Sequence, residues 1–94
     1  MYMNTRQPQY TDALNLWGED FQKSMFHEEI GEVLTAISHN KRGRCGNDAV
    51  LEELADLQIM LNQMVILYGT DEEFKTVLNA KLTRLVERIE RYKI

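Results

Sequence analysis

Residues 48–68 of the chain read DAVLEELADLQIMLNQMVILY. This long stretch between two glycine-containing breaks is typical of an α-helix. Apolar residues cover most of the circumference of that helix: Leu51, Leu54, Leu57, Ile59, Met60, Leu61, Met64, Val65 and Leu67. A helix that is apolar on nearly every side is buried on more than one side. Because a chain of 94 residues has few other helices to surround it, we expect part of this helix to face a second copy.

The residues before this stretch predict two further helices. After a polar amino-terminal segment that contains Pro8, a short helix is expected over about residues 11–17, and Gly18 ends or kinks it. A longer helix is expected over about residues 19–39, where one face is apolar. Residues 40–46 contain two glycines and several charges, which oppose continuation of the helix. Asn47 or Asp48 is then expected to cap the helix that follows.

The residues after the central stretch predict a fourth helix that runs to the end of the chain. Gly69 is a natural C-cap, and Thr70 and Glu73 have the spacing of a capping box. Apolar residues follow in a heptad-like stripe flanked by Lys and Arg: Phe74, Leu78, Leu82, Leu85, Ile89 and Tyr92. The predicted fold is therefore all-α, with residues 1–94 as a single domain. We expect an antiparallel bundle of about four helices that is completed by oligomerisation.

Composition limits the classes of partner. The apolar fraction of 44% is ordinary for a globular domain, and the net charge is −4 with scattered basic residues, which argues against binding of bulk nucleic acid. No apolar run reaches the length that crosses a membrane. The single Cys45 excludes an intramolecular disulfide and a multi-cysteine zinc site. We therefore expect a soluble, cytoplasmic protein.

Two pairs of carboxylates are the most informative feature of the chain. Glu29 and Glu32 lie three residues apart on the second predicted helix, and Glu53 and Asp56 have the same spacing on the third. Residues three apart share a helix face, and each pair lies close to apolar residues. If the two helices pack antiparallel across residues 40–46, the four carboxylates converge.

Four converging anions are costly unless a cation joins them, because each loses hydration and repels the others. Carboxylate oxygens select hard ions, so Mg²⁺ is the expected metal and Mn²⁺ is an alternative. Magnesium bound by few carboxylates keeps waters that a phosphate can replace, which suggests phosphate chemistry. An acidic pair on a solvated helix face is the simpler interpretation of each pair taken alone. A zinc-protease motif is excluded because Gly31 stands where its second His would be.

The pattern Glu29-Ile-Gly-Glu32 followed by Glu53-Leu-Ala-Asp56 resembles the signature of the MazG-like all-α nucleoside triphosphate pyrophosphohydrolases. The similarity covers about three quarters of the chain. Its flanking elements are Trp17-Gly18, Gln22, Arg42-Gly43-Arg44, the run from Leu57 to Leu61, and Lys81-Leu82-x-Arg84.

The resemblance implies hydrolysis of a nucleoside triphosphate, with a ribose or deoxyribose sugar, to a monophosphate and pyrophosphate. It implies that Glu29, Glu32, Glu53 and Asp56 hold Mg²⁺, and that Glu32 or Glu29 orients or deprotonates the attacking water. It also implies a homodimer or homotetramer with active sites near the subunit interfaces. Clearance of damaged or surplus nucleotides is the expected purpose.

Further residues receive weaker roles from the same resemblance. Lys81, Arg84 and Arg44 are candidates for phosphate binding, although basic residues beside an apolar stripe are usually solvated. Trp17 and Gln22 are candidates for contacting the base, although a lone Trp at a helix end is more often a core residue. The alternative function is a non-catalytic helical dimer that binds nucleotide or a protein partner through its acidic cluster.

Overall fold

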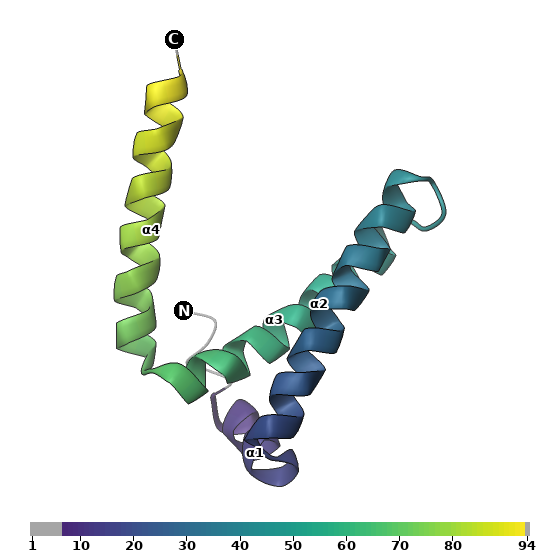
Figure 1. The fold of residues 1–94 in the computed structure, drawn as a ribbon, viewed down its shortest axis with the longest axis vertical. Helices are drawn as coiled ribbons and strands as arrows, with labels where there is room; N and C mark the ends of the chain where they lie inside the picture. The colour runs from purple at the N-terminus through teal and green to yellow at the C-terminus, as the bar shows by residue number, and fades with distance from the viewer. Residues whose placement is uncertain (1–6, 94) are drawn as a thin grey trace.

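The computed structural model describes residues 7–93 and consists of four α-helices in that range, with no strand (Figure 1). They are α1 (Gln7–Trp17), α2 (Glu19–Lys41), α3 (Asn47–Tyr68) and α4 (Asp71–Tyr92). The all-α prediction is confirmed. None of the helices in the described part combines the length and apolar character that a membrane span needs.

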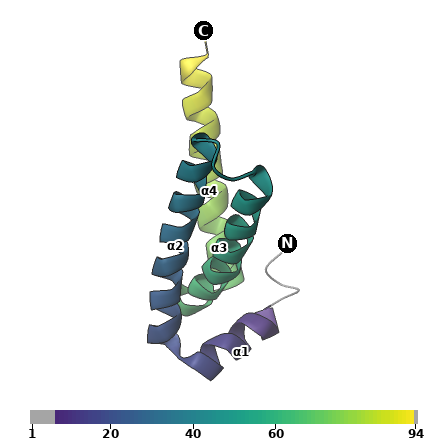
Figure 2. The same ribbon diagram turned by 90° about the vertical axis from the view of Figure 1, so that its right-hand side faces the viewer.

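The helices α2 and α3 form an antiparallel hairpin, and α1 crosses its base (Figure 2). Side chains from these three helices supply the buried apolar core: Tyr10, Leu14, Val33, Met64 and Val65. The core therefore lies at the base, where α3 contacts both other helices. Residues closer to the 42–46 loop are held by the α2/α3 pairing alone.

The helix α4 leaves this unit and projects away from the hairpin (Figure 1). Its first two turns pack against the end of α3, but every residue from 79 to 93 is exposed. The single chain is therefore a three-helix unit with a projecting fourth helix rather than a closed four-helix bundle. Completion of a bundle would need another chain.

Two helix starts differ from the sequence prediction. The first helix begins at Gln7 instead of about residue 11, and Pro8 lies in its first turn, where the missing N–H has no helical partner to lose. The third helix begins at Asn47, so its N-cap is Gly46 rather than Asn47 or Asp48. The Asn47 side chain instead accepts a hydrogen bond of 3.1 Å from Nδ2 of Asn40, which ties the two ends of the loop together.

The predicted breaks at the other helix ends are confirmed. Gly18 has φ of 93°, a left-handed value that glycine adopts without strain, and it separates α1 from α2. The Gly69 amide donates to the Val65 carbonyl at 3.0 Å. At the start of α4, Oγ1 of Thr70 accepts from the Glu73 amide at 3.1 Å and the Glu73 carboxylate accepts from the Thr70 amide at 2.8 Å. This capping box fixes where α4 begins.

Candidate functional site

Three of the four sequence-predicted carboxylates come together in the middle of the α2/α3 hairpin. One oxygen each of Glu29, Glu53 and Asp56 can be chosen so that all three lie within 4.8 Å of one another. The antiparallel pairing of α2 and α3 produces this convergence, because it places the turn that carries Glu29 opposite the turn that carries Glu53 and Asp56.

Two oxygens in this cluster are enclosed without a hydrogen-bond donor. Oε2 of Glu29 and Oε1 of Glu53 are both buried and have no partner. An unsatisfied buried acceptor costs about 1–3 kcal/mol, and more when it carries charge. Within residues 7–93, no protein group therefore donates a hydrogen bond to these two oxygens.

The crowding also perturbs the acidity of the cluster. The pKa of Glu29 is raised from 4.5 to about 7, first by burial, then by a hydrogen bond with Glu53, and then by the negative charges of Glu32, Asp56 and Glu53. When all carboxylates are ionised no donor is present, but a protonated Glu29 can donate to Glu53. A proton and a metal ion thus offer two ways to relieve the same repulsion.

The donor set fits a hard divalent cation. Ligand oxygens sit about 2.0–2.6 Å from Mg²⁺ or Ca²⁺, so two oxygens on one ion lie up to about 4–5 Å apart. The separation within the cluster matches this limit. The cluster contains no nitrogen or sulfur ligand, so soft metals are disfavoured. Glu29, Glu53 and Asp56 could therefore hold a hard divalent ion.

Glu32 lies one turn farther along α2, outside the group of three. It is exposed and lines a shallow groove of about 520 Å³ at the loop end of the hairpin. The groove is lined by Glu28, Gly31, Glu32, Thr35, Ala36, His39, Cys45, Ala49 and Glu53. Glu53 belongs to both the groove and the carboxylate cluster, so a ligand in the groove would touch the cluster directly.

Small residues keep this groove open. A side chain added at Gly31 would meet no other atom within 4 Å, and Ala36 and Ala49 present only methyl groups from the two facing helices. The volume lies within the range of about 300–1,000 Å³ that is common for small-molecule sites. Sequence reasoning gave no role to Glu28 or His39, and no spacing rule could have placed them in this groove.

The predicted phosphate-binding residues lie apart from the cluster in the single chain. Lys81 and Arg84 are exposed on the projecting part of α4, and Figure 1 shows this part separated from the hairpin. Arg44 is exposed in the 42–46 loop, where its amide donates to the His39 carbonyl at 2.8 Å. Arg44 is at the groove end of the hairpin, whereas the two α4 residues can reach a carboxylate cluster only if another chain supplies them.

The two predicted base-contacting residues have different surroundings. Trp17, at the end of α1, is 57% exposed, so it is not a core residue. Gln22 is only 4% exposed, and its Nε2 donates to Oε1 of Gln63 at 2.7 Å. A contact between Gln22 and a base would require this buried amide pair to open.

The Gln22–Gln63 pair belongs to a polar network that sequence reasoning missed. Nδ2 of Asn62, which is 1% exposed, donates to the Tyr10 hydroxyl at 2.9 Å, and Gln58 donates to Oδ1 of Asn62 at 2.9 Å. The Asn62–Tyr10 and Gln22–Gln63 bonds join α3 to α1 and α2 at the base of the hairpin, and the Gln58–Asn62 bond lies within α3. The available signal was the three polar residues that interrupt the apolar run of α3, which would otherwise be unsatisfied in a core.

The comparisons with known proteins add no assignment: no protein-family model, curated protein or solved structure matches the chain.

Proposed function

We propose that the chain is a Mg²⁺-dependent nucleoside triphosphate pyrophosphohydrolase of the MazG-like kind. The observation that carries the proposal is the convergence of Glu29, Glu53 and Asp56, with two buried oxygens that lack donors. A protein gains nothing from enclosing such oxygens unless a cation or proton is bound there. The adjacent groove supplies space for a ligand that shares the cation.

In this proposal, Glu29, Glu53 and Asp56 hold Mg²⁺, with Mn²⁺ as a substitute. The ion would neutralise charge on the phosphates and lower the pKa of a bound water. Glu32 is the preferred residue for orienting the water and accepting its proton, because it is exposed at the groove beside the cluster. The water oxygen bonds to phosphorus as the α–β phosphoanhydride breaks, which releases a nucleoside monophosphate and pyrophosphate.

The groove supports a bound nucleotide rather than a buried metabolite. It is open to solvent at the loop end of the hairpin, where the Arg44 amide bonds to the carbonyl of His39, a residue that lines the groove. Trp17 lies at the opposite end of α2 and is separated from the groove by several helical turns. A base contact by Trp17, and phosphate contacts by Lys81 and Arg84, therefore call for a homodimer or homotetramer in which another copy supplies them.

The direct test is a substrate panel. The protein is incubated with Mg²⁺ or Mn²⁺ and each ribonucleoside and deoxyribonucleoside triphosphate, including oxidised bases, and the products are separated by anion exchange. The proposal expects monophosphate and pyrophosphate in equal amounts, with no diphosphate or orthophosphate. Chelation by EDTA should stop the reaction. Absence of turnover with every substrate and both metals would contradict the proposed activity.

One observation favours a second candidate, a non-catalytic nucleotide-binding dimer. Only three of the four carboxylates meet, and no basic side chain is paired with them in the described residues. Such a protein would bind Mg²⁺ and nucleotide without hydrolysis. Equilibrium binding of a non-hydrolysable triphosphate analogue, measured beside the substrate panel, separates the two, because the second candidate predicts binding and no products.

A further inference from the structure

The projecting part of α4 exposes a stripe of large apolar side chains. Leu82 and Leu85 are each 48% exposed, Ile89 is 46% exposed and Tyr92 is 82% exposed. Within residues 7–93, no residue of α4 is buried. A helix in a protein owes most of its stability to packing of its apolar face, so this face calls for a partner.

The size of the molecule gives the same result independently. The chain exposes 7197 Å² of surface, whereas a compact monomer of 11.0 kDa exposes about 5,600 Å². Its radius of gyration is 16.1 Å, against about 12 Å for a compact domain of this length. The excess of about 1,600 Å² is larger than the ~800 Å² that each partner buries in a standard protein interface. The excess exposed surface is therefore large enough for an interface with a second copy of the chain.

Charges along α4 favour one orientation of that copy. The helix begins with Asp71, Glu72 and Glu73 and has a basic second half. The basic residues of that half are Lys81, Arg84, Arg88, Arg91 and Lys93, with two glutamates among them. Two parallel copies of α4 would place like charges together at each end, whereas antiparallel copies place the acidic start beside the basic end.

We propose that α4 pairs antiparallel with α4 of a second copy, along a seam formed by Leu78, Leu82, Leu85, Ile89 and Tyr92. These residues alternate in steps of four and three, which keeps them on one face of two helices that pack side by side. When Leu82 of one copy faces Leu85 of the other, Leu78 faces Ile89. The interface is two-fold symmetric and uses the same surface of both copies.

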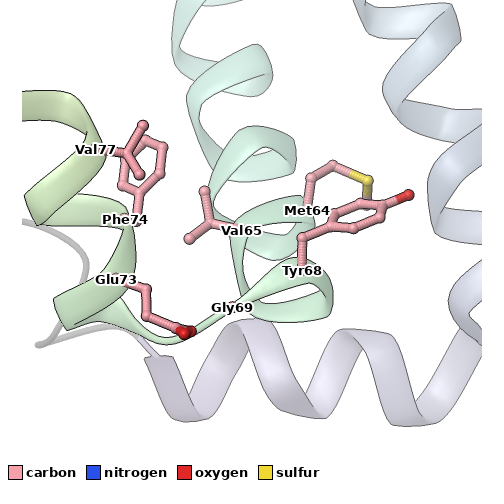
Figure 3. A pocket seen from close by; sticks show the side chains of 7 residues that line it. All are labelled: Met64, Val65, Tyr68, Gly69, Glu73, Phe74 and Val77. Atoms are coloured by element: carbon pink, nitrogen blue, oxygen red, sulfur yellow. The ribbon is translucent and has the colours of Figure 1, made fainter. Parts of the chain in front are cut away.

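In this arrangement the end of the partner helix lies in the angle between the end of α3 and the start of α4. An apolar cavity of about 390 Å³ lies there, with Val65 pointing toward α4 and with Phe74 and Val77 on the facing side (Figure 3). The same alignment brings Tyr92 of the other copy opposite Lys75, next to Phe74. The exposed Tyr92 ring therefore fills the apolar cavity between α3 and α4 of its partner, and each copy covers this cavity in the other.

The first experiment measures the mass of the protein in solution by sedimentation equilibrium. The wild-type chain should be a dimer or a larger even assembly, and Leu85→Glu with Ile89→Glu should weaken association at least 100-fold. Ala80→Glu with Thr83→Glu is the matched control, because it adds the same charge to the opposite side of α4. A monomeric wild type, or an equal effect of both double variants, would overturn the proposal.

The second experiment determines the orientation with substitutions that keep the seam apolar. On a Cys45→Ser background, Leu78→Cys and Ile89→Cys variants are oxidised separately and as a refolded mixture. Antiparallel pairing predicts a disulfide-linked dimer in the mixture and little in either variant alone. Efficient cross-linking of Leu78→Cys with itself overturns the antiparallel arrangement, and cross-linking in none of the samples overturns the assignment to α4. Neither experiment depends on catalytic activity, so the pairing and the proposed function fail separately.

Discussion

In the α2/α3 hairpin, carboxylate oxygens from two helices are enclosed without donors, whereas in α4 the apolar side chains lie open to solvent along most of the helix. The first region has unpaired carboxylate oxygens between two helices, and the second has apolar groups where a surface is expected. Each departure points to a different missing component. Enclosed anions are satisfied by a cation, and an open apolar stripe is satisfied by another protein surface.

The largest expected effect tests whether the hairpin cluster supports catalysis. Replacement of Glu53 by Gln removes one of the charges proposed to bind the metal, on a residue that belongs to both the cluster and the groove. Turnover, measured as pyrophosphate release, should fall by at least about 100-fold because charge on the phosphates is no longer neutralised in the transition state. Glu52→Gln, at the exposed neighbouring position, is the control and should retain most of the activity. Equal activity of the two variants would remove Glu53 from the site.

The next effect tests the cluster as a cation site without any substrate. Mg²⁺ or Mn²⁺ at about one hundred times its Kd should raise the free energy of unfolding by ~2.7 kcal/mol, because only the folded chain gathers the ligands. Urea unfolding is compared with metal and with EDTA at equal ionic strength, so that general screening cancels. The gain should disappear in Asp56→Asn and persist in the α4 seam variants. A gain that survives loss of Asp56 would place the metal elsewhere.

A smaller effect is expected in the polar network at the base of the hairpin. Unlike the carboxylate oxygens of the cluster, the buried amides of this network are hydrogen-bonded. Gln63→Leu leaves the buried Nε2 of Gln22 without an acceptor and should cost about 1–3 kcal/mol of unfolding free energy. Adding Gln22→Leu should restore part of the loss, since both partners are then apolar. A double-mutant cycle by urea unfolding measures this coupling. Additive losses would show that the two amides do not depend on each other.

Much of the fold follows from local signals. The spacing of apolar residues in 48–68, the left-handed Gly18 and the capping box of Thr70 and Glu73 act over one or two helical turns, so the sequence was sufficient to predict helices there. The projection of α4 had no such signal. A stripe such as Leu82, Leu85 and Ile89 has the same spacing whether it packs on its own chain or on another.

Local sequence signals likewise predicted only part of the candidate site. The i, i+3 spacing predicted that each carboxylate pair shares a face, but residues three apart still differ by about 60° around the helix. Packing of α2 on α3 selects Glu29 for the cluster and leaves Glu32 at the groove. Gln22 was predicted as a ligand contact, yet it pairs with a residue 41 positions away. Long-range pairs of this kind depend on how the helices meet, which one helix's pattern does not contain.

The smallest expected effect is a pH dependence of the free energy of unfolding that comes from Glu29 in the hairpin. Below about pH 4.5 Glu29 is protonated in both the folded and unfolded chains, and above about pH 7 it is ionised in both. Between these values the folded state holds a proton that the unfolded state has lost, so raising the pH through this window destabilises the fold. Glu29→Gln should remove this pH dependence and stabilise the metal-free protein at pH 8, by on the order of 1 kcal/mol after screening by solvent.

Urea unfolding in EDTA from pH 4 to pH 8 measures this difference, with Glu28→Gln as the control for loss of an exposed charge one residue away. The wild-type and Glu29→Gln curves should meet at the acid end and separate as the pH rises. Saturating Mg²⁺ should reverse their order at pH 8, because the wild type then gains a cation that the amide holds poorly. A curve for Glu29→Gln that runs parallel to the wild type would mean that the enclosed oxygens of the hairpin cost the fold nothing. The exposed apolar stripe of α4 would then be the one remaining region of the two that lacks a partner.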